Sequence, residues 1–596
     1  MKKNNLWFFT RGYRKFYIKA FLMVIIATIF AYISPLLIRF TIDHIIANKP
    51  TEWVQSQQFF LHHGLWLIAV SLICFAIVEG FFNYMRSYYA QYAAEGIARD
   101  IREKLYNHIQ HLSCAFHNKN DTGDMIQRCT SDVETIRRFL AMHVSEISRS
   151  CIMVVLVVPI MLYLNLVMTL VAVIAIPFIF IFAIVFFRKM QHTFKITDEA
   201  EARMTTAVQE NLTASKVVRA FGRKDHEIKK FSVKNVEYRD KHYRVIRLIA
   251  WYWSISDLIC LLQIAAILIF GSLWTIYGYI SLGTLVVFIT YEAMLLWPIR
   301  HMGRILADFG KTTVAAKRIA HILNEIEEQK SIFKNEKEKL RGAIYFENVS
   351  FSYEKQKPVL QNLSFRIKKG QTVAILGATG SGKSTIVKLL LRLYEQNSGK
   401  ITIDNIDIKT IERKTLREQI GIVLQNPFLY SKTIYDNLLW GNLEANEDKI
   451  YQAAEVASMH KTIQNFEMGY QTKLGERGVT LSGGQKQRTA IARTLLRETP
   501  ILIFDDSFSA VDTETENSIL QSLRQKVLNK TTLIIAHRLS TVMNADWILF
   551  LENGKVVQQG THHDLVNQPG AYQRIWKMQY DNNIDIAQRV HAPPCI

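Results

Sequence analysis

Long apolar runs separated by basic segments fill the first half of the chain. A membrane-spanning helix needs about 20 apolar residues to cross a hydrocarbon core about 30 Å thick. Ala20–Ile38 and Gly64–Met85 each suit one crossing. Cys151–Phe187 carries no charge and would measure about 55 Å as a single helix, which is too long for one crossing. We therefore predict that it folds back near Tyr163–Asn165.

The same reasoning divides Leu258–Tyr291 into two spans at Tyr277–Gly283. No A-x-A-like cleavage site follows the first apolar run, which favours a retained helix over a signal peptide. The pattern thus predicts a helical transmembrane domain over 1–324, with six spans at about 18–38, 64–85, 145–163, 166–187, 250–276 and 282–304.

From about Gly342 the pattern changes to short β-rich apolar runs that alternate with helical patterns. This alternation is typical of an α/β domain with a largely parallel sheet. We predict a linker over 325–341, the α/β domain over 342–580 and a tail over 581–596. Strands are expected at Gly342–Phe351, Leu363–Ile367, Thr372–Leu376, Ile501–Phe504 and Thr532–Ala536.

The net charge of +20 and a pI near 9.5 would suggest nucleic acid as a partner of a soluble protein. Here the basic residues gather in two segments, Arg86–Arg149 and Arg188–Arg247, between apolar spans, whereas the outer loops are poor in Lys and Arg. By the positive-inside rule, these segments, both termini and the α/β domain are cytoplasmic. We expect each segment to be a helical hairpin that extends the spans beyond the bilayer. The six scattered cysteines form no CxxC pattern and predict neither a disulfide framework nor a metal site.

One motif carries phosphate chemistry. A Gly-rich stretch of the form GxxxxGK[ST] follows the predicted strand Thr372–Leu376 and precedes an amphipathic helix, which is the context of a phosphate-binding P-loop. Backbone N–H groups of such a loop cradle phosphates at the positive end of a helix. The lysine would contact the β- and γ-phosphates, and the serine hydroxyl would bind Mg²⁺. The nucleotide-binding residues predicted here are Gly377, Ala378, Thr379, Gly380, Ser381, Gly382, Lys383, Ser384 and Thr385.

A second acidic element completes this chemistry. The apolar strand Ile501–Phe504 ends in Asp505 and Asp506. In P-loop ATPases the first acid holds Mg²⁺ and the next residue positions the attacking water. We therefore predict an ATP site with Mg²⁺ bound by Ser384 and Asp505, and with Asp506 as the catalytic residue that positions the attacking water.

Further motifs in 342–575 resemble the ABC ATPases. Leu481–Arg488 resembles the family's signature sequence, so the resemblance implies that Ser482, Gly483, Gly484 and Gln485 contact ATP across a dimer. It also implies roles for other residues of the site: Tyr353 stacks on adenine, Gln425 senses Mg²⁺, Ser509–Asp512 forms the D-loop, His537 contacts the γ-phosphate, and Glu476–Gly478 is the exporter X-loop.

The order of a six-span domain before an ATPase domain resembles bacterial half-transporters of the multidrug and lipid exporter group. Thr122–Ile126, Val217–Gly222 and Trp297–Arg300 also resemble segments of that group. The resemblance implies ATP-driven export of hydrophobic or amphipathic compounds across the plasma membrane, by a dimer in which each ATP lies between one subunit's P-loop and the other's signature. An ATP-gated channel or regulator and a peptide exporter stay open as alternatives. The substrate leaves no motif.

Asp506 departs from the family pattern, which has glutamate at this position. The shorter side chain displaces the carboxylate, and catalysis is sensitive to displacements of about 1 Å. The intact signature beside this change predicts one member of a heterodimer with unequal sites. A homodimer in which Asp506 is competent is the alternative.

Three acids, Glu79, Asp257 and Glu292, lie in or at the edge of predicted spans. Such acids are costly in a membrane and suggest substrate contacts or gating. For Asp257, an ion pair at a helix end is the favoured interpretation, and the roles of the other two stay open.

Overall fold

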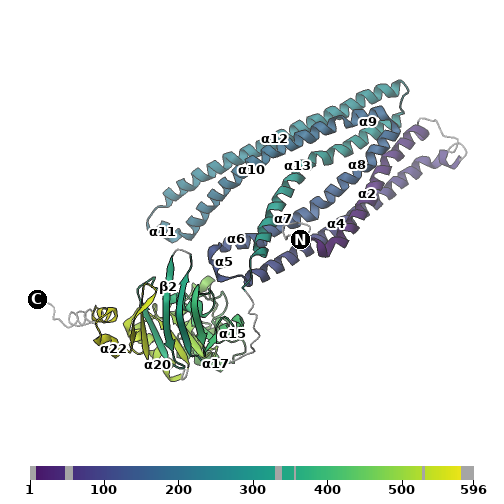
Figure 1. The fold of residues 1–596 in the computed structure, drawn as a ribbon. Coiled ribbons are helices and arrows are strands. Elements are labelled where there is room, and N and C mark those ends of the chain that lie inside the picture. Colours follow the sequence, from purple (N-terminus) through teal and green to yellow (C-terminus); the bar gives the residue numbers. More distant parts are fainter. Residues whose placement is uncertain (1–8, 47–57, 329–338, 355–356, 527–529, 579–596) are drawn as a thin grey trace. The chain divides into compact units, whose positions relative to one another are not determined.

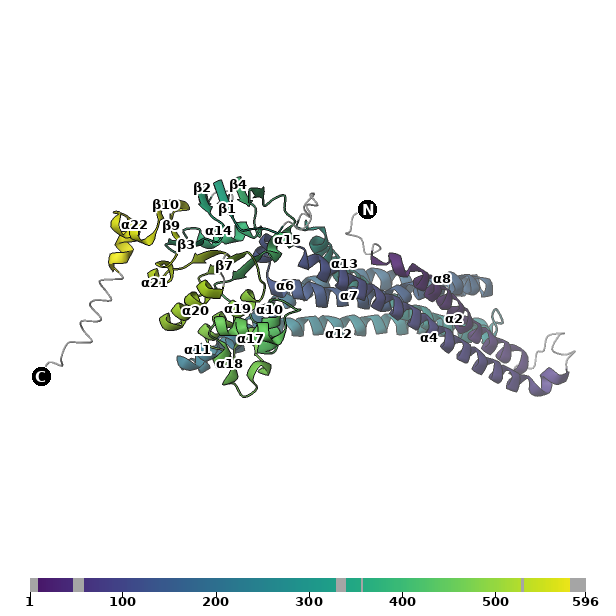
Figure 2. The same ribbon diagram turned by 90° about the horizontal axis from the view of Figure 1, so that it is seen from below.

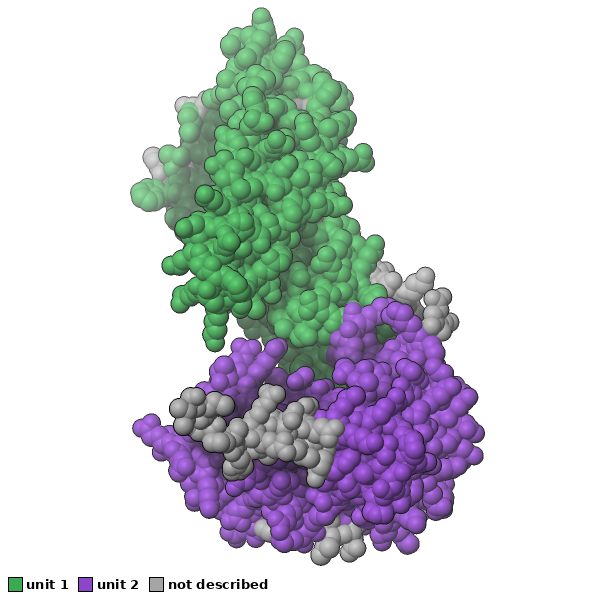
Figure 3. All heavy atoms as spheres, turned by 90° about the vertical axis from the view of Figure 1, so that its left-hand side faces the viewer, with its two compact units in different colours: residues 1–112, 120–327 green, residues 113–119, 328–596 purple. Residues whose placement is uncertain are grey.

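The computed structural model describes residues 9–46, 58–328, 339–354, 357–526 and 530–578 (Figure 1). These residues form two compact units, coloured separately in Figure 3. The first comprises Met1–Leu112 and Asn120–Glu327, and the second comprises Ser113–Lys119 and Glu328–Ile596. The predicted tail over 581–596 and the linker's central part, 329–338, lie outside the described residues.

Helices are the only regular elements among the described residues of the first unit, apart from one isolated bridge between Leu112 and Glu327 (Figure 1). Its longest helices are α4 (Gln58–Gln110), α10 (Ala175–Thr213), α12 (Lys224–Ile276) and α13 (Leu282–Asn324). The remaining helical elements are η1 (Arg11–Tyr13), α2 (Arg14–Phe40), η2 (Thr41–Ile46), α6 (Thr122–Gln127), η3 (Arg128–Asp132), α7 (Val133–Arg138), η4 (Phe139–His143), α8 (Val144–Leu164), α9 (Leu166–Val173) and α11 (Ser215–Ala220).

The predicted reversals between spans are confirmed. The chain breaks at Asn165, whose side chain accepts a hydrogen bond from Met168 N at 3.0 Å and caps α9. It breaks again between α12 and α13, where Gly278 has a φ of 78°, a left-handed conformation that glycine adopts without strain. Ser281 caps α13 by accepting a hydrogen bond from Thr284 N.

The basic segments are confirmed as helical extensions of the spans. At 1.5 Å per residue, α12 is about 80 Å long, far more than one crossing requires. It returns the chain from α11, antiparallel to α10, against which it packs (Figure 1). Among the described residues, five helices are long and apolar enough to cross a membrane, and the apolar part of α13, Leu282–Pro298, is shorter. The predicted count of six spans is therefore supported for five of them by length and composition.

Polar groups inside the helical unit are paired where the helices break. Gln263 on α12 donates hydrogen bonds from Nε2 to the carbonyl oxygens of Val171 and Ala172, at 2.6 and 2.9 Å. These carbonyls lie beside the break between α9, which ends at Val173, and α10, which begins at Ala175. Tyr291 on α13 likewise donates from its hydroxyl to the carbonyl of Tyr32, at 2.7 Å. These bonds fix α12 against α9 and α13 against α2.

The second unit contains two sheets (Figure 2). A four-stranded antiparallel sheet has the order β2-β1-β4-β5, formed by β1 (Ile344–Ser352), β2 (Pro358–Ile367), β4 (Ser398–Ile403) and β5 (Ile406–Asp407). A six-stranded sheet has the order β10-β9-β3-β8-β7-β6, formed by β3 (Thr372–Gly377), β6 (Ile420–Val423), β7 (Ile501–Asp505), β8 (Thr531–Ile535), β9 (Trp547–Glu552) and β10 (Lys555–Gly560). All its neighbouring pairs are parallel except β9 and β10.

The six-stranded sheet is the core of this unit. Strand β7 is buried at every position, and its side chains alternate between the two main hydrophobic clusters. A parallel strand covered on both faces has this continuous apolar pattern, so the predicted largely parallel α/β domain is confirmed. The helices of the unit are α5 (Cys114–Lys119), α14 (Lys383–Leu390), α15 (Arg413–Glu418), α16 (Ile434–Leu439), α17 (Glu447–Val456), α18 (His460–Gln464), η5 (Gly469–Gln471), η6 (Glu476–Gly478), α19 (Gly483–Leu495), α20 (Thr513–Lys526), α21 (Leu539–Val542) and α22 (His562–Asn567).

One short helix of the second unit comes from far upstream in the sequence. Helix α5 lies between α4 and α6 in the chain but groups with the α/β unit. Asn118 donates a hydrogen bond from Nδ2 to the Tyr394 hydroxyl, at 2.6 Å. The boundary at 324 that the sequence predicts does not anticipate this exchange.

Candidate ATP-binding site

The P-loop joins β3 to α14 at the carboxyl edge of the six-stranded sheet. Gly377 ends β3 with a φ of 153°, and a Cβ atom there would overlap the carbonyl of Leu551. Gly382, with a φ of 103°, is the N-cap of α14. Only glycine combines these conformations with so close a backbone approach. The tight loop that results lies at the N-terminus of α14, where backbone N–H groups can bind an anion.

Lys383 is nearly buried and held by its own loop. Its Nζ donates hydrogen bonds to the carbonyl oxygens of Gly377 and Ala378, at 2.8 and 2.9 Å. Burial lowers the pKa of Lys383, while Asp506 and Asp505 act in the opposite direction. A buried ammonium group in this loop is suited to form a charge-assisted hydrogen bond with a phosphate oxygen.

Two oxygen ligands lie together beside the loop. Ser384 donates a hydrogen bond from Oγ to Asp505 Oδ1, at 2.9 Å, and Asp505 is 7% exposed. Burial raises the pKa of the Asp505 carboxyl, and the hydrogen bond from Ser384 opposes that shift. A hydroxyl and a carboxylate are the hard oxygen donors that Mg²⁺ takes alongside phosphates and water. The residues therefore fit this ion.

Asp506 and Gln425 face each other across the site. Gln425 donates from Nε2 to Asp506 Oδ2, at 3.1 Å. Asp506 itself has a φ of 48°, and its backbone N–H donates to the Ile535 carbonyl at 2.9 Å. Aspartate tolerates this left-handed conformation better than most residues. The carboxylate is thus fixed at the end of β7, next to Asp505.

One cavity of about 330 Å³ gathers most of the predicted residues. It brings together elements far apart in the sequence: the end of β1, the P-loop, the loop after β6, and the carboxyl ends of β7 and β8. The predicted residues that line it are Tyr353, Thr379, Gly380, Gly382, Lys383, Ser384, Thr385, Gln425, Asp505, Asp506 and His537. Ligands of open α/β sheets bind at this edge.

Tyr353 lies at the cavity mouth with 44% of its surface exposed. Its hydroxyl is 3.2 Å from Thr385 Oγ1, and the Lys388 ammonium lies 5.4 Å from the ring centre. An exposed aromatic ring beside a phosphate loop offers a stacking surface for a base. Lys388 was not singled out from the sequence. Its position on α14, next to this ring, supplies a second cation at the mouth.

The signature residues lie apart from this cavity. Ser482 is the N-cap of α19 and forms a capping box with Gln485, whose amide side chain accepts from Ser482 N at 2.9 Å. Gly484 lies against the Ala510 carbonyl, 2.8 Å from where a Cβ would be. Ser482, Gly483, Gly484 and Gln485 do not line the nucleotide cavity. The P-loop and the signature of one chain are thus separate surfaces.

Arg538, next to His537, is a second residue that the sequence did not single out. Its guanidinium donates to the carbonyl oxygens of Ser509 and Val511, at 3.2 and 3.0 Å, and pairs with buried Glu516 at 3.2 Å. Arg538 therefore links the predicted D-loop, Ser509–Asp512, to the segment that follows β8 and contains His537.

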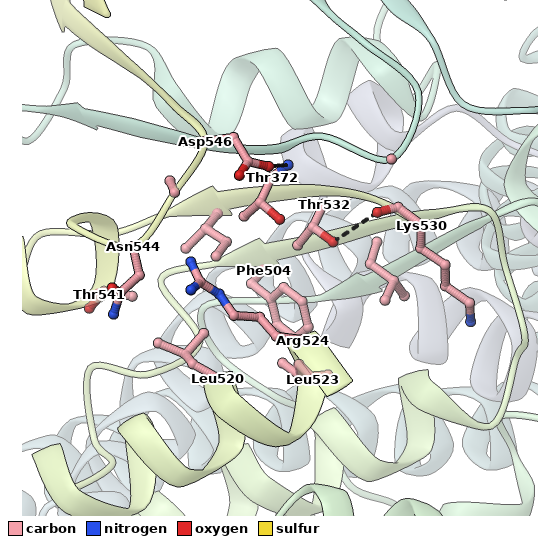
Figure 4. Close-up of a pocket in the computed structure, with 14 residues that line it drawn as sticks. Thr372, Phe504, Leu520, Leu523, Arg524, Lys530, Thr532, Thr541, Asn544 and Asp546 are labelled. Carbon is pink, nitrogen blue, oxygen red and sulfur yellow. Dashed lines mark hydrogen bonds between the residues drawn. The ribbon is translucent and has the colours of Figure 1, made fainter. Parts of the chain in front are cut away.

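A second cavity, of about 400 Å³, lies at the opposite edge of the same sheet (Figure 4). Thr372 starts β3 there, Thr532 is the second residue of β8, and Asp546 accepts a hydrogen bond from Thr372 N at 2.7 Å. Leu520, Leu523 and Arg524 of α20 form another side. None of the residues predicted from the sequence lines this cavity.

Comparison with known proteins agrees with this geometry. Residues 17–299 match the model of the ABC transporter transmembrane region, and residues 360–509 match the ABC transporter model. The chain is 33% identical over 575 residues to the "Putative multidrug export ATP-binding/permease protein YgaD" of Bacillus subtilis (strain 168), covering 96% of this chain and 98% of that protein. It is 35% identical over 547 residues to a "Putative multidrug export ATP-binding/permease protein" of Staphylococcus aureus (strain NCTC 8325 / PS 47), covering 91% and 94%.

Among solved structures, a bacterial Atm1-family ABC exporter with ATP bound superposes with a TM-score of 0.81 at 28% identity. The match covers 95% of this chain and 99% of that one. Helical spans, a P-loop ATPase domain and a signature sequence thus occur here in the order found in such exporters. The chain belongs to the ABC transporter family, as a multi-pass bacterial membrane exporter whose cytoplasmic ATPase domain hydrolyses ATP to drive transport.

Proposed function

We propose that this chain is one half of a dimeric exporter that moves hydrophobic or amphipathic compounds out of the cell by alternating access. The observation that carries this proposal is the separation of the signature, at the start of α19, from the cavity that holds the P-loop. A complete ATP site then requires the signature of a second subunit. Relatives named as multidrug export proteins support the substrate class.

The site residues take the following roles in this proposal. Lys383 turns from the P-loop carbonyls to the β- and γ-phosphates, and Tyr353 stacks on adenine. Ser384, Asp505 and Gln425 would hold Mg²⁺, which would neutralise charge on the phosphates. His537 contacts the γ-phosphate, and Asp506 orients the attacking water. Ser482 and Gly484 of this chain contact the ATP bound to the partner's P-loop.

We further propose a heterodimer with unequal sites. Asp506 accepts its hydrogen bond from Gln425 on a side chain one methylene shorter than glutamate, which leaves its carboxylate short of the position that glutamate reaches. The P-loop of this chain then forms the slow site, and its intact signature completes the fast site on a partner that has glutamate. A homodimer is the competing arrangement.

Two short helices of the membrane-domain sequence support the coupling that export requires. α5 bonds to Tyr394 within the ATPase unit, and α11 presents exposed Val217, with exposed Phe221 directly after the helix. In the proposed dimer, α11 docks on an ATPase domain. A regulator that binds ATP without pumping would not require Gln425, His537 and the signature to be intact. Their presence therefore favours an exporter.

The test is vectorial transport. The chain is purified alone and with the half-transporter encoded beside it, reconstituted into inside-out proteoliposomes, and supplied with a fluorescent amphiphilic dye. We expect ATP-dependent dye uptake by the pair and little by the chain alone. Uptake should disappear with Lys383→Ala. A pair that hydrolyses ATP without any dye gradient would support a regulator or channel, and brisk uptake by the chain alone would support the homodimer.

A further inference from the structure

A cavity of about 430 Å³ in the helical unit is lined by two arginines and a histidine from three different helices. Arg86 comes from α4, Arg149 from α8 and His301 from α13. Met153, Met294 and Trp297 give the rest of the wall an apolar character. A small adjoining hollow shares Arg86 and Arg149. The two arginines thus face the same internal space from different helices.

Neither arginine is paired with an acid among the residues that the structure describes. Arg86 and Arg149 form no hydrogen bond or ion pair with any residue that the structure describes. Arg86 Nε and His301 Nδ1 are both buried without a hydrogen-bond partner among these residues. A buried guanidinium that lacks an acceptor costs free energy, which an anionic ligand in the cavity would recover.

The nearby acids are already engaged. Glu146 lines the cavity, but its carboxylate is 3.0 Å from His143 Nδ1, and the other nitrogen of that ring is 2.9 Å from Asp308. Glu79, in the adjoining hollow, accepts a hydrogen bond from Asn83 at 3.4 Å. Neither acid forms an ion pair with Arg86 or Arg149.

The position of the cavity suits an amphiphile. Arg86 follows the second expected span, Arg149 begins the third and His301 lies near the end of the sixth. All three therefore lie toward the cytoplasmic ends of the expected spans, while Tyr32, which lines the same cavity, lies within the first span. Arginines at such ends often extend to the membrane surface, but these two line a cavity inside the bundle. An apolar wall with two unpaired guanidinium groups matches an anionic head on an apolar body.

We propose that this cavity binds amphiphiles with an anionic head group, such as a phosphate, through Arg86 and Arg149. The inference rests on the proposed export function and names the substrate class for it. The head would accept hydrogen bonds from the guanidinium groups, while the apolar body lies against Met153, Met294 and Trp297. The same chemistry is offered by a membrane phospholipid and by a soluble alkyl phosphate.

The test is equilibrium binding to the purified pair in nanodiscs, with radiolabelled dodecyl phosphate as the probe. Dodecyltrimethylammonium has the same tail and the opposite charge, and inorganic phosphate has the head alone. We expect dodecyl phosphate to bind at least about tenfold more tightly than either, since hydrogen bonds to charged groups are worth at least a factor of that size. Equal binding of the cationic amphiphile would overturn the proposal.

Variants localise the site. Arg86→Gln and Arg149→Gln should each weaken dodecyl phosphate binding about tenfold or more, and Arg149→Lys should restore part of it. Arg188→Gln is the matched control, because Arg188 is an exposed arginine that lines neither cavity. Unchanged binding by both Gln variants, in samples that melt like the wild type, would contradict the proposal.

The lipid composition of the nanodiscs distinguishes a lipid ligand from a soluble one. Weaker binding of dodecyl phosphate to the pair in phosphatidylglycerol nanodiscs than in phosphatidylcholine nanodiscs would show that an anionic lipid competes for the cavity, which supports a lipid ligand. Equal binding in the two lipids supports a soluble amphiphile. Dye transport by a pair that binds no anionic amphiphile would overturn this inference alone, whereas a pair without any ATP-dependent transport would remove the export function itself.

Discussion

Arg538 shows how one side chain organises the end of the ATP site. It follows His537, holds two carbonyl oxygens of the Ser509–Asp512 loop and pairs with Glu516, which is 1% exposed. Thr541 also donates to this buried carboxylate. A buried charge depends on its partners, so the network fixes the loop relative to β8.

Arg538→Ala should therefore loosen that loop. We expect the free energy of unfolding of the ATPase domain to fall by about 1–3 kcal/mol, because a buried carboxylate loses its cation. ATP turnover by the pair should slow as well. Thermal unfolding and Mg²⁺-ATPase assays measure the two effects. Arg524→Ala is the control, since Arg524 is exposed and no hydrogen bond of its side chain is found in the described structure. Equal stability of the two variants would contradict this account of the network.

At the scale of elements, α5 connects the membrane-domain sequence to Tyr353 at the mouth of the ATP site. Asn118 bonds to the Tyr394 hydroxyl, and the Tyr394 ring packs edge-on against Tyr353, with centroids 5.0 Å apart. Phe351 packs against both tyrosines. Movement of α5 would thus reach the ring that we propose stacks on adenine through one hydrogen bond and one aromatic contact.

Asn118→Ala and Tyr394→Phe should both weaken this link. Each removes one partner of the same hydrogen bond, which is worth about 0.5–1.5 kcal/mol. We expect the stimulation of ATPase activity by a transported amphiphile to fall about two- to tenfold in either variant. The double variant should lose no more than the larger single effect, because the two residues share one interaction. Additive losses would show that the residues act separately.

Some of these elements could be predicted from the sequence and others could not. The P-loop was predictable because Gly377–Ser384 lies between a strand pattern and a helix pattern, and the span breaks because no helix of such length fits a bilayer. The grouping of α5 with the ATPase unit was not, since a six-residue helix has no periodicity that identifies its partner. The roles of Lys388 and Arg538 depend on side-chain directions that spacing alone does not specify. The pairing of Asp257 was anticipated: it bonds to Arg300 at 2.6 Å.

The acids inside the spans show the same limit. Glu292 is 0% exposed, and neither carboxylate oxygen has a hydrogen-bond partner among the described residues. The sequence indicates that a carboxyl group at this position of a span costs free energy, and its burial without a hydrogen bond agrees. Neither the sequence nor the described structure identifies a group that binds it. Glu79, by contrast, borders the hollow that Arg86 and Arg149 share, so its surroundings belong to the cationic cavity.

At the scale of the whole molecule, one chain supplies two complementary half-sites. The P-loop, Gln425, Asp505, Asp506 and His537 form one surface, and the signature at Ser482–Gln485 forms another. In the dimer that we propose, each surface pairs with its counterpart on the other subunit. When one chain has aspartate where the other has glutamate, the two composite sites differ in turnover while both bind ATP. The intact signature then serves the faster site.

The most direct test is Mg²⁺-ATPase activity of the chain alone and of the pair, each with Asp506→Glu and Asp506→Asn. We predict that the chain alone is nearly silent and that the pair is active. Asp506→Asn should leave much of the pair's ATPase activity, because the site at the partner's P-loop accounts for most of the hydrolysis. Asp506→Glu should raise the turnover of the slow site. Brisk hydrolysis by the chain alone, abolished by Asp506→Asn, would contradict the unequal-site account and establish a homodimer with a working aspartate.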